Sequence, residues 1–128
     1  YAQRFRQLGV QNVRTDSEGN VIGEIRGTRP GPTLLLAGHL DTVFPEGTDV
    51  SVKREGTKLI GPGIGDDCRG LAVVLVVAKQ IITQKIPFNG RLLVSGNVGE
   101  EGPGNLRGVR ALFNKTLKDS IDLFISVD

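Results

Sequence analysis

The chain has 128 residues and a formal net charge of +2, from 16 Lys and Arg against 14 Asp and Glu. This weak balance and an aromatic content of 5% disfavour nucleic acid or a membrane surface as a partner. No apolar run approaches the roughly 20 residues of a membrane span. Cys68 is the single cysteine, which excludes an internal disulfide and leads us to expect a reducing, cytoplasmic location.

The apolar patterns predict strands that alternate with helices along the chain. In chain order we expect the end of a helix at 1–8, a hairpin at 13–26, a strand at 33–37, a hairpin at 50–60, a helix at 69–85, a strand at 91–95, a helix at 105–117 and a strand at 121–127. The apolar run 33–37 is typical of a strand covered on both faces. Helical spacing in 105–117 predicts four inward side chains, those of Leu106, Val109, Leu112 and Phe113. This alternation predicts an α/β fold with a mixed, mostly parallel sheet flanked by helices.

Both ends of the chain lead us to expect further sequence. The chain begins at Tyr1 without an initiator Met and ends at Asp128, directly after an apolar run that we expect to form a buried strand. Domain boundaries normally fall in polar, flexible linkers. We therefore expect residues 1–128 to be part of a longer protein.

Side chains that can bind metal gather near the predicted strand ends and the start of the long helix. They are His39 and Asp41 after 33–37, Glu100 and Glu101 after 91–95, Asp128 after 121–127, and Asp66 and Asp67 before the helix at 69–85. Ligands of open α/β sheets bind beyond the carboxyl ends of the strands. Arg69 is the one Lys or Arg close to these residues in the sequence, and carboxylates that are brought together repel one another. A divalent metal ion is therefore the natural counter-charge. An imidazole with carboxylates suits zinc, with cobalt or manganese as substitutes, and disfavours a calcium site.

Taken singly, these signals are weak. A lone histidine after a strand is usually structural, and a Glu-Glu pair usually lies in a solvated loop. Their order is specific. The segments Gly-His-Leu-Asp-Thr-Val at 38–43, Gly-Pro-Gly-Ile-Gly-Asp-Asp at 61–67 and Gly-Glu-Glu-Gly at 99–102 resemble the motifs of the dinuclear zinc exopeptidase and deacylase family. That family includes aminotripeptidase, glutamate carboxypeptidase, aminoacylase and succinyl-diaminopimelate desuccinylase.

The resemblance implies a role for each of six residues. His39 and Asp128 would bind one metal ion, Asp66 would bridge two ions, Glu101 would bind the second, Glu100 would be the general base, and Asp41 would orient His39. It also implies a cis peptide bond between Asp66 and Asp67. Adjacent residues on extended chain face opposite ways, so we expect Glu100 and Glu101 to point to different places. The sequence departs from the family at Gly99, where Asp is common, and at Cys68, where Lys often stands.

By the same resemblance, residues 1–128 would be the N-terminal portion of a metallopeptidase catalytic domain. The rest of that domain and the lid or dimerisation domain, through which the full protein would form a homodimer, would be absent. The implied function is hydrolysis of a peptide or amide bond in a small peptide by a water activated by two zinc ions. Asp128 favours an aminopeptidase- or dipeptidase-like exopeptidase. Two alternatives stay open: a deacylase of N-acyl amino acids, and a non-catalytic, metal-stabilised peptide-binding relative.

Overall fold

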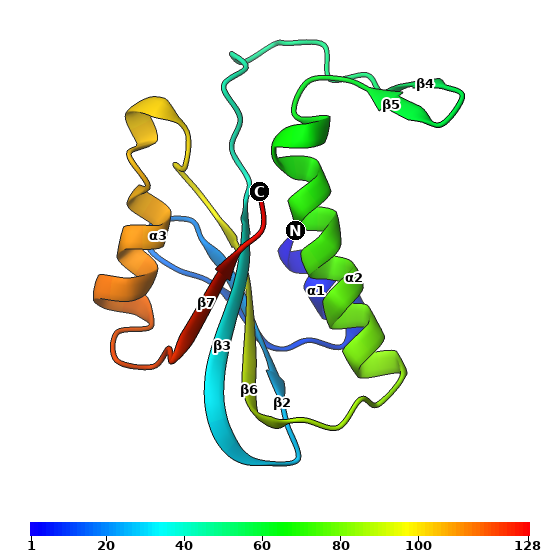
Figure 1. Ribbon diagram of the computed structural model, residues 1–128. Helices are drawn as coiled ribbons and strands as arrows, with labels where there is room; N and C mark the ends of the chain where they lie inside the picture. The colour runs from blue at the N-terminus through cyan, green and yellow to red at the C-terminus, as the bar shows by residue number, and fades with distance from the viewer.

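A five-stranded sheet forms the centre of the computed structural model, which describes residues 1–128 (Figure 1). Its strands, in spatial order, are β1 (Gln11–Thr15), β2 (Val21–Arg26), β6 (Asn89–Asn97), β3 (Arg29–His39) and β7 (Leu123–Ser126). β2 pairs antiparallel with β1 and β6, whereas β3 pairs parallel with β6 and β7. All strands except β2 therefore point the same way, which confirms the predicted mixed, mostly parallel α/β sheet.

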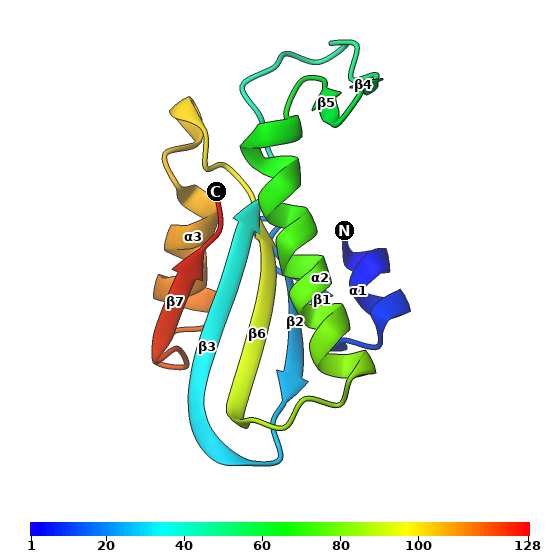
Figure 2. The same cartoon turned by 45° about the vertical axis from the view of Figure 1, so that its right-hand side comes forward.

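Helices cover both faces of this sheet. α1 (Ala2–Leu8) and α2 (Arg69–Thr83) lie on one face, and α3 (Arg107–Ala111) with the π-helical turn Leu112–Thr116 lies on the other (Figures 1 and 2). A separate hairpin of β4 (Lys53–Glu55) and β5 (Lys58–Ile60) projects beyond the carboxyl edge of the sheet. None of the helices combines the length and the apolar character that crossing a membrane requires.

The core consists of two apolar clusters, one on each side of the sheet. Successive strand residues point to opposite faces, so Leu36 and Leu92 join the cluster beneath α1 and α2, while Leu35 and Leu93 join the cluster beneath α3. Four of the five residues of the predicted strand 33–37 are buried, and the fifth is half-buried. This burial confirms the expectation of a strand covered on both faces.

Two predictions about apolar side chains are wrong. α3 begins only at Arg107, because Leu106 has a φ of 57° and stays exposed, and Phe113 is exposed against the ring of Phe124. The strand β7 is not buried either: all four of its residues are exposed. The reason is its position, since β7 pairs with β3 on one side only and forms an edge of the sheet.

Candidate metal centre

The predicted metal ligands meet at the carboxyl edge of the sheet. His39 is the last residue of β3, Glu100 and Glu101 follow β6, and Asp128 follows β7. Ligating atoms of His39, Asp66 and Asp128 lie within 4.8 Å of one another, and so do those of His39, Glu100 and Glu101. His39 belongs to both groups. The structure therefore brings all four predicted ligands and the predicted base to one place.

Asp66 reaches this edge from the kinked segment Ile64–Cys68, which precedes α2. The bond between Asp66 and Asp67 is cis, as the family resemblance implied. Asp67 is buried, and its carboxylate accepts the N–H groups of His39 at 2.9 Å and Gly70 at 2.8 Å. Asp67 thus ties the end of β3 to the first turn of α2. Asp67 was among the side chains expected near a metal, but it belongs to neither group of ligands, and its place just before a helix was the signal for its main-chain role.

The imidazole of His39 is fixed in one orientation, with one nitrogen left for a ligand. Nδ1 donates to the main-chain carbonyl of Asp41 at 2.9 Å, which leaves a lone pair on Nε2 in the neutral ring. Nε2 lies 2.8 Å from Oδ1 of Asp66, yet that contact lacks hydrogen-bond direction. Nε2 is the one buried side-chain nitrogen or oxygen without a hydrogen-bond partner. A nitrogen lone pair and a carboxylate oxygen this close repel each other unless a cation lies with them.

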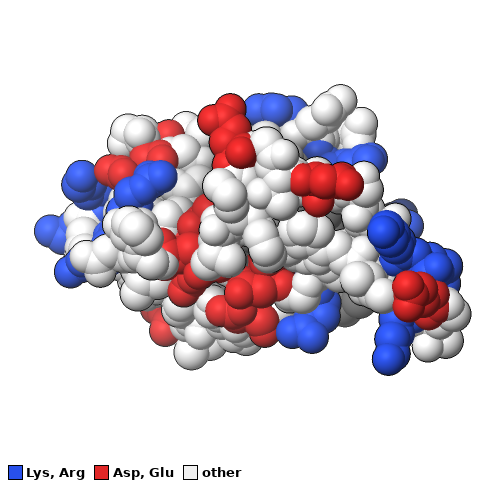
Figure 3. Space-filling model, turned by 90° about the horizontal axis from the view of Figure 1, so that it is seen from above, with Lys and Arg blue, Asp and Glu red and all other residues white.

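The electrostatics of the centre also favour a cation. Burial lowers the pKa of His39, but the Asp41 carbonyl and the carboxylates of Asp66 and Asp67 outweigh it and raise that pKa. Desolvation and the charges of Asp66 and Glu100 raise the pKa of Glu101. Seen from above, several Asp and Glu side chains gather in the middle of this face, and Lys and Arg lie around its margin (Figure 3). The donor set of one imidazole and several carboxylates fits a divalent metal such as zinc.

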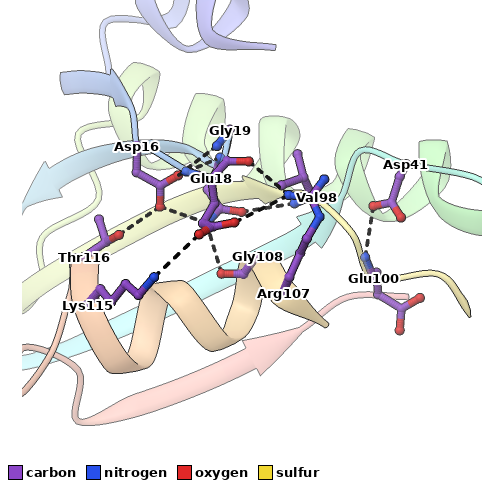
Figure 4. Close-up of polar contacts among 11 residues, drawn as sticks. Asp16, Glu18, Gly19, Asp41, Val98, Glu100, Arg107, Gly108, Lys115 and Thr116 are labelled. Atoms are coloured by element: carbon purple, nitrogen blue, oxygen red, sulfur yellow. Dashed lines mark hydrogen bonds and ion pairs between the residues drawn. The ribbon is translucent and has the colours of Figure 1, made fainter. Parts of the chain in front are cut away.

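Asp41 contacts the ring of His39 through its main-chain carbonyl and not through its carboxylate. Its Oδ1 lies 3.8 Å from Nδ1 of His39, too far for a hydrogen bond. The carboxylate instead accepts the N–H groups of Glu100 at 3.2 Å, drawn in Figure 4, and of Glu101 at 3.1 Å. Partial burial would raise the pKa of Asp41, but these two N–H groups lower it below its usual range. Asp41 orients His39 through its main chain and holds the Glu100–Glu101 loop through its side chain.

The two glutamates share the metal centre, but only Glu101 also lines the adjacent cleft. A carboxylate oxygen of Glu100 lies within 4.8 Å of one from Glu101. β6 ends at Asn97, and Gly99, with a φ of 65°, turns the chain before the pair. A cleft of about 510 Å³ opens beside this loop, lined by both Asp41 and Glu101.

Comparison with known proteins places this chain in a family. The sequence model of peptidase family M28 matches residues 20–128. Carboxypeptidase G2 from Pseudomonas sp. (strain RS-16) is 37% identical over an alignment of 104 residues, and the match covers 76% of this chain and 25% of that protein. A second relative, the putative [LysW]-lysine/[LysW]-ornithine hydrolase of Pyrococcus abyssi (strain GE5 / Orsay), is 36% identical over 110 residues, or 86% of this chain and 28% of that protein.

Solved structures of peptidases also match this chain. The aminopeptidase PepT from Bacillus cereus ATCC 10987 matches with a TM-score of 0.79 and 26% identity, over 99% of this chain and 36% of its own. A tripeptidase from Staphylococcus aureus subsp. aureus Mu50 matches with a TM-score of 0.78 and 28% identity, over 98% of this chain and 35% of its own. The chain thus spans about a quarter to a third of the length of the relatives it matches. The chain belongs to peptidase family M28.

Proposed function

We propose that this chain carries the metal-binding and base-catalytic part of a metal-dependent exopeptidase that acts on small peptides. The observation that supports this most is the buried Nε2 of His39, which has no hydrogen-bond partner and faces carboxylates from three other segments. A structural histidine would have that nitrogen satisfied. The relatives described as an aminopeptidase, a tripeptidase and a carboxypeptidase favour a peptide as substrate.

We propose, further, that residues 1–128 are the N-terminal portion of a larger catalytic domain. The support is the small fraction of each relative's length that the chain spans, which is 25% for carboxypeptidase G2 and 36% for the aminopeptidase PepT. The remainder of the full-length protein would supply the missing ligand of the second ion and the groups that hold the substrate. Activity therefore belongs to the full-length protein.

Four residues of this chain would hold the two ions. His39, Asp66 and Asp128 would hold one ion, and Asp66 with Glu101 would hold part of the shell of the second. Two zinc ions, when bound, would lower the pKa of a water molecule and polarise the carbonyl of the scissile bond. Asp67 and Asp41 would keep these ligands in place through the main chain of His39 and of Glu101.

Glu100 would move the proton. As water attacks the carbonyl carbon, a Glu100 carboxylate oxygen accepts a proton from that water, and the carboxylic acid then gives it to the departing amine nitrogen as the C–N bond breaks. The main-chain N–H of Glu100 donates to Oδ1 of Asp41, so the base is held by the same residue that orients the histidine. These two hydrogen bonds would keep Glu100 and His39 at a fixed distance and orientation relative to each other.

The decisive experiment compares Glu100→Gln with Glu101→Gln in the full-length protein. The first should lower kcat for a tripeptide by about 100- to 10,000-fold, the usual contribution of a general base, with zinc content near that of the wild type. The second should lower zinc content itself. Zinc is measured by mass spectrometry after gel filtration, and hydrolysis by release of the amino product.

Three results would contradict the proposal. Equal loss of zinc in both variants would show that Glu100 is a ligand and not the base. A zinc-loaded wild type that cleaves no dipeptide or tripeptide but cleaves N-acetyl amino acids would make the protein a deacylase. Absence of turnover on either class would favour the non-catalytic relative.

A further inference from the structure

The cleft beside the metal centre contains one cationic side chain. Three charged residues line its volume of about 510 Å³: Asp41, Glu101 and Arg107. The Asp41 carboxylate already accepts two main-chain N–H groups, and Glu101 is a proposed metal ligand. Arg107 is then the one charged group of the cleft that remains for a substrate.

The structure holds Arg107 in this position from both ends. Its main-chain N–H donates to the carbonyl of Gly99 at 3.2 Å, and its Nη1 donates to the carbonyl of Glu18, also at 3.2 Å. Its aliphatic stem crosses Gly99 so closely that a Cβ at residue 99 would lie 2.6 Å from Cγ of Arg107. Glycine at this position, where the related family commonly has aspartate, gives the arginine its room.

The nearby carboxylate of Glu18 does not occupy all the hydrogen-bond donors of the Arg107 guanidinium. Its Nη1 lies 3.7 Å from a carboxylate oxygen of Glu18, but Lys115 approaches the other oxygen of Glu18 at the same distance (Figure 4). Nε and Nη2 of Arg107 make no hydrogen bond within the chain, and 52% of the side chain is exposed. A guanidinium fixed through one nitrogen, with two donors left over, is suited to a planar, two-oxygen acceptor.

We infer that Arg107 binds a carboxylate of the substrate and makes the enzyme selective for peptides that carry one near the scissile bond. The inference rests on the proposed function and adds a specificity residue to it. The carboxylate has two possible sources, the free C-terminus of the peptide or an acidic side chain. A neutral amide at the same place would leave the guanidinium with a weaker partner and would be a poorer substrate.

The test uses three tripeptides on the full-length enzyme: Ala-Ala-Ala, its C-terminal amide, and the amide Ala-Ala-Glu-NH2. In the wild type a carboxylate-bearing peptide should exceed the plain amide in kcat/KM by about tenfold or more, the scale of one charged hydrogen bond. Arg107→Gln should remove that advantage, mainly through KM, and Arg107→Lys should keep part of it. Whichever peptide carries the advantage identifies the source of the carboxylate.

The matched control is Arg110→Gln, which removes the same charge from the same helix but outside the cleft, and it should leave all ratios unchanged. An unaltered carboxylate preference in Arg107→Gln would overturn the inference. If the wild type cleaves none of the peptides, the proposed function is wrong, but carboxylate binding by Arg107 can still be tested. N-acetylalanine is then titrated by calorimetry into the zinc-loaded wild type and into zinc-loaded Arg107→Gln. Equal Kd values for the two proteins would refute the inference.

Discussion

Asp41 would organise the proposed metal centre without supplying a ligand to it. Its carbonyl sets the tautomer of His39, and its carboxylate holds the main chain of Glu100 and Glu101. A residue that positions metal ligands in this way affects metal affinity although it touches no metal. The contact from Asp41 to Glu101 spans 60 positions of the chain, so it depends on the fold being formed.

We therefore expect Asp41→Asn to weaken zinc binding. The substitution keeps the carbonyl that orients His39 but replaces one carboxylate oxygen by an NH2 group, so the N–H of Glu100 or of Glu101 loses its acceptor. Zinc affinity, measured by competition with a chromogenic chelator, should fall about 10- to 100-fold. Asp49→Asn is the control, because the Asp49 carboxylate bonds only Ser51 on an exposed loop. An unchanged zinc Kd in the Asp41 variant would refute this role.

Among the elements, the β1–β2 turn has the densest set of side-chain hydrogen bonds. The carboxylate of Asp16 accepts the main-chain N–H groups of Glu18, Gly19 and Asn20, and also the side chains of Asn20 and Thr116 (Figure 4). Thr116 belongs to the π-helical turn after α3. Asp16 thus closes a hairpin and attaches it to the helical layer on one face of the sheet.

This arrangement predicts a pH-dependent contribution to stability. Partial burial would raise the pKa of Asp16, but the hydrogen bonds from Asn20, Thr116 and Glu18 outweigh it and lower that pKa below its usual value. A carboxyl with a depressed folded-state pKa stabilises the fold above its unfolded pKa of about 3.9 and loses that effect as the pH falls through the folded value.

Asp16→Ala should accordingly lower the free energy of unfolding at pH 7 by about 1–3 kcal/mol. The deficit relative to the wild type should shrink as the pH falls from about 4, the unfolded pKa, through the lower pKa of the folded-state carboxyl. Urea unfolding followed by circular dichroism at pH 7, 5 and 3 measures both effects. A deficit that is the same at pH 3 as at pH 7 would mean that the charge of Asp16 contributes nothing.

At the scale of the whole molecule, the direction of the strands decides where the chemistry lies. β3, β6 and β7 are parallel, so His39, the glutamate pair and Asp128 emerge at one edge, and α2 brings the Asp66 loop to the same edge. The first proposed ion has three protein ligands here. The second has only Asp66 and Glu101, whereas catalytic zinc sites generally have three protein ligands.

We therefore expect the 128-residue chain by itself to bind fewer than two equivalents of zinc and to show no measurable peptidase activity. Calorimetric titration of the metal-free chain gives the stoichiometry, and a tripeptide assay gives the activity. His39→Ala, which removes the nitrogen common to both groups of ligands, should abolish binding. Two tightly bound zinc ions together with turnover would show that the ligand assignment is wrong.

The sequence by itself determined the elements and the places of the chemistry. Alternation and helical spacing are local properties, so the hairpin 13–26, the strand 33–37 and the helix from Arg69 could be predicted, as could the strand ends that carry His39 and the glutamates. The three motifs at 38–43, 61–67 and 99–102 indicated the family, which the match to residues 20–128 confirms. Zinc as the metal, the homodimer and the cytoplasmic location stay predictions.

Only the tertiary structure decided which groups hydrogen-bond to one another or pack together. Asp67 bonds the main chain of His39, and Arg107 packs across Gly99 into the cleft, and neither contact leaves a periodic trace in the sequence. The exposure of Leu106 and β7 also depended on tertiary position, because side-chain hydrophobicity shows what can be buried but not whether a neighbour is present to bury it. Hydrogen bonds between residues distant in the chain form only when the fold brings their donors and acceptors together.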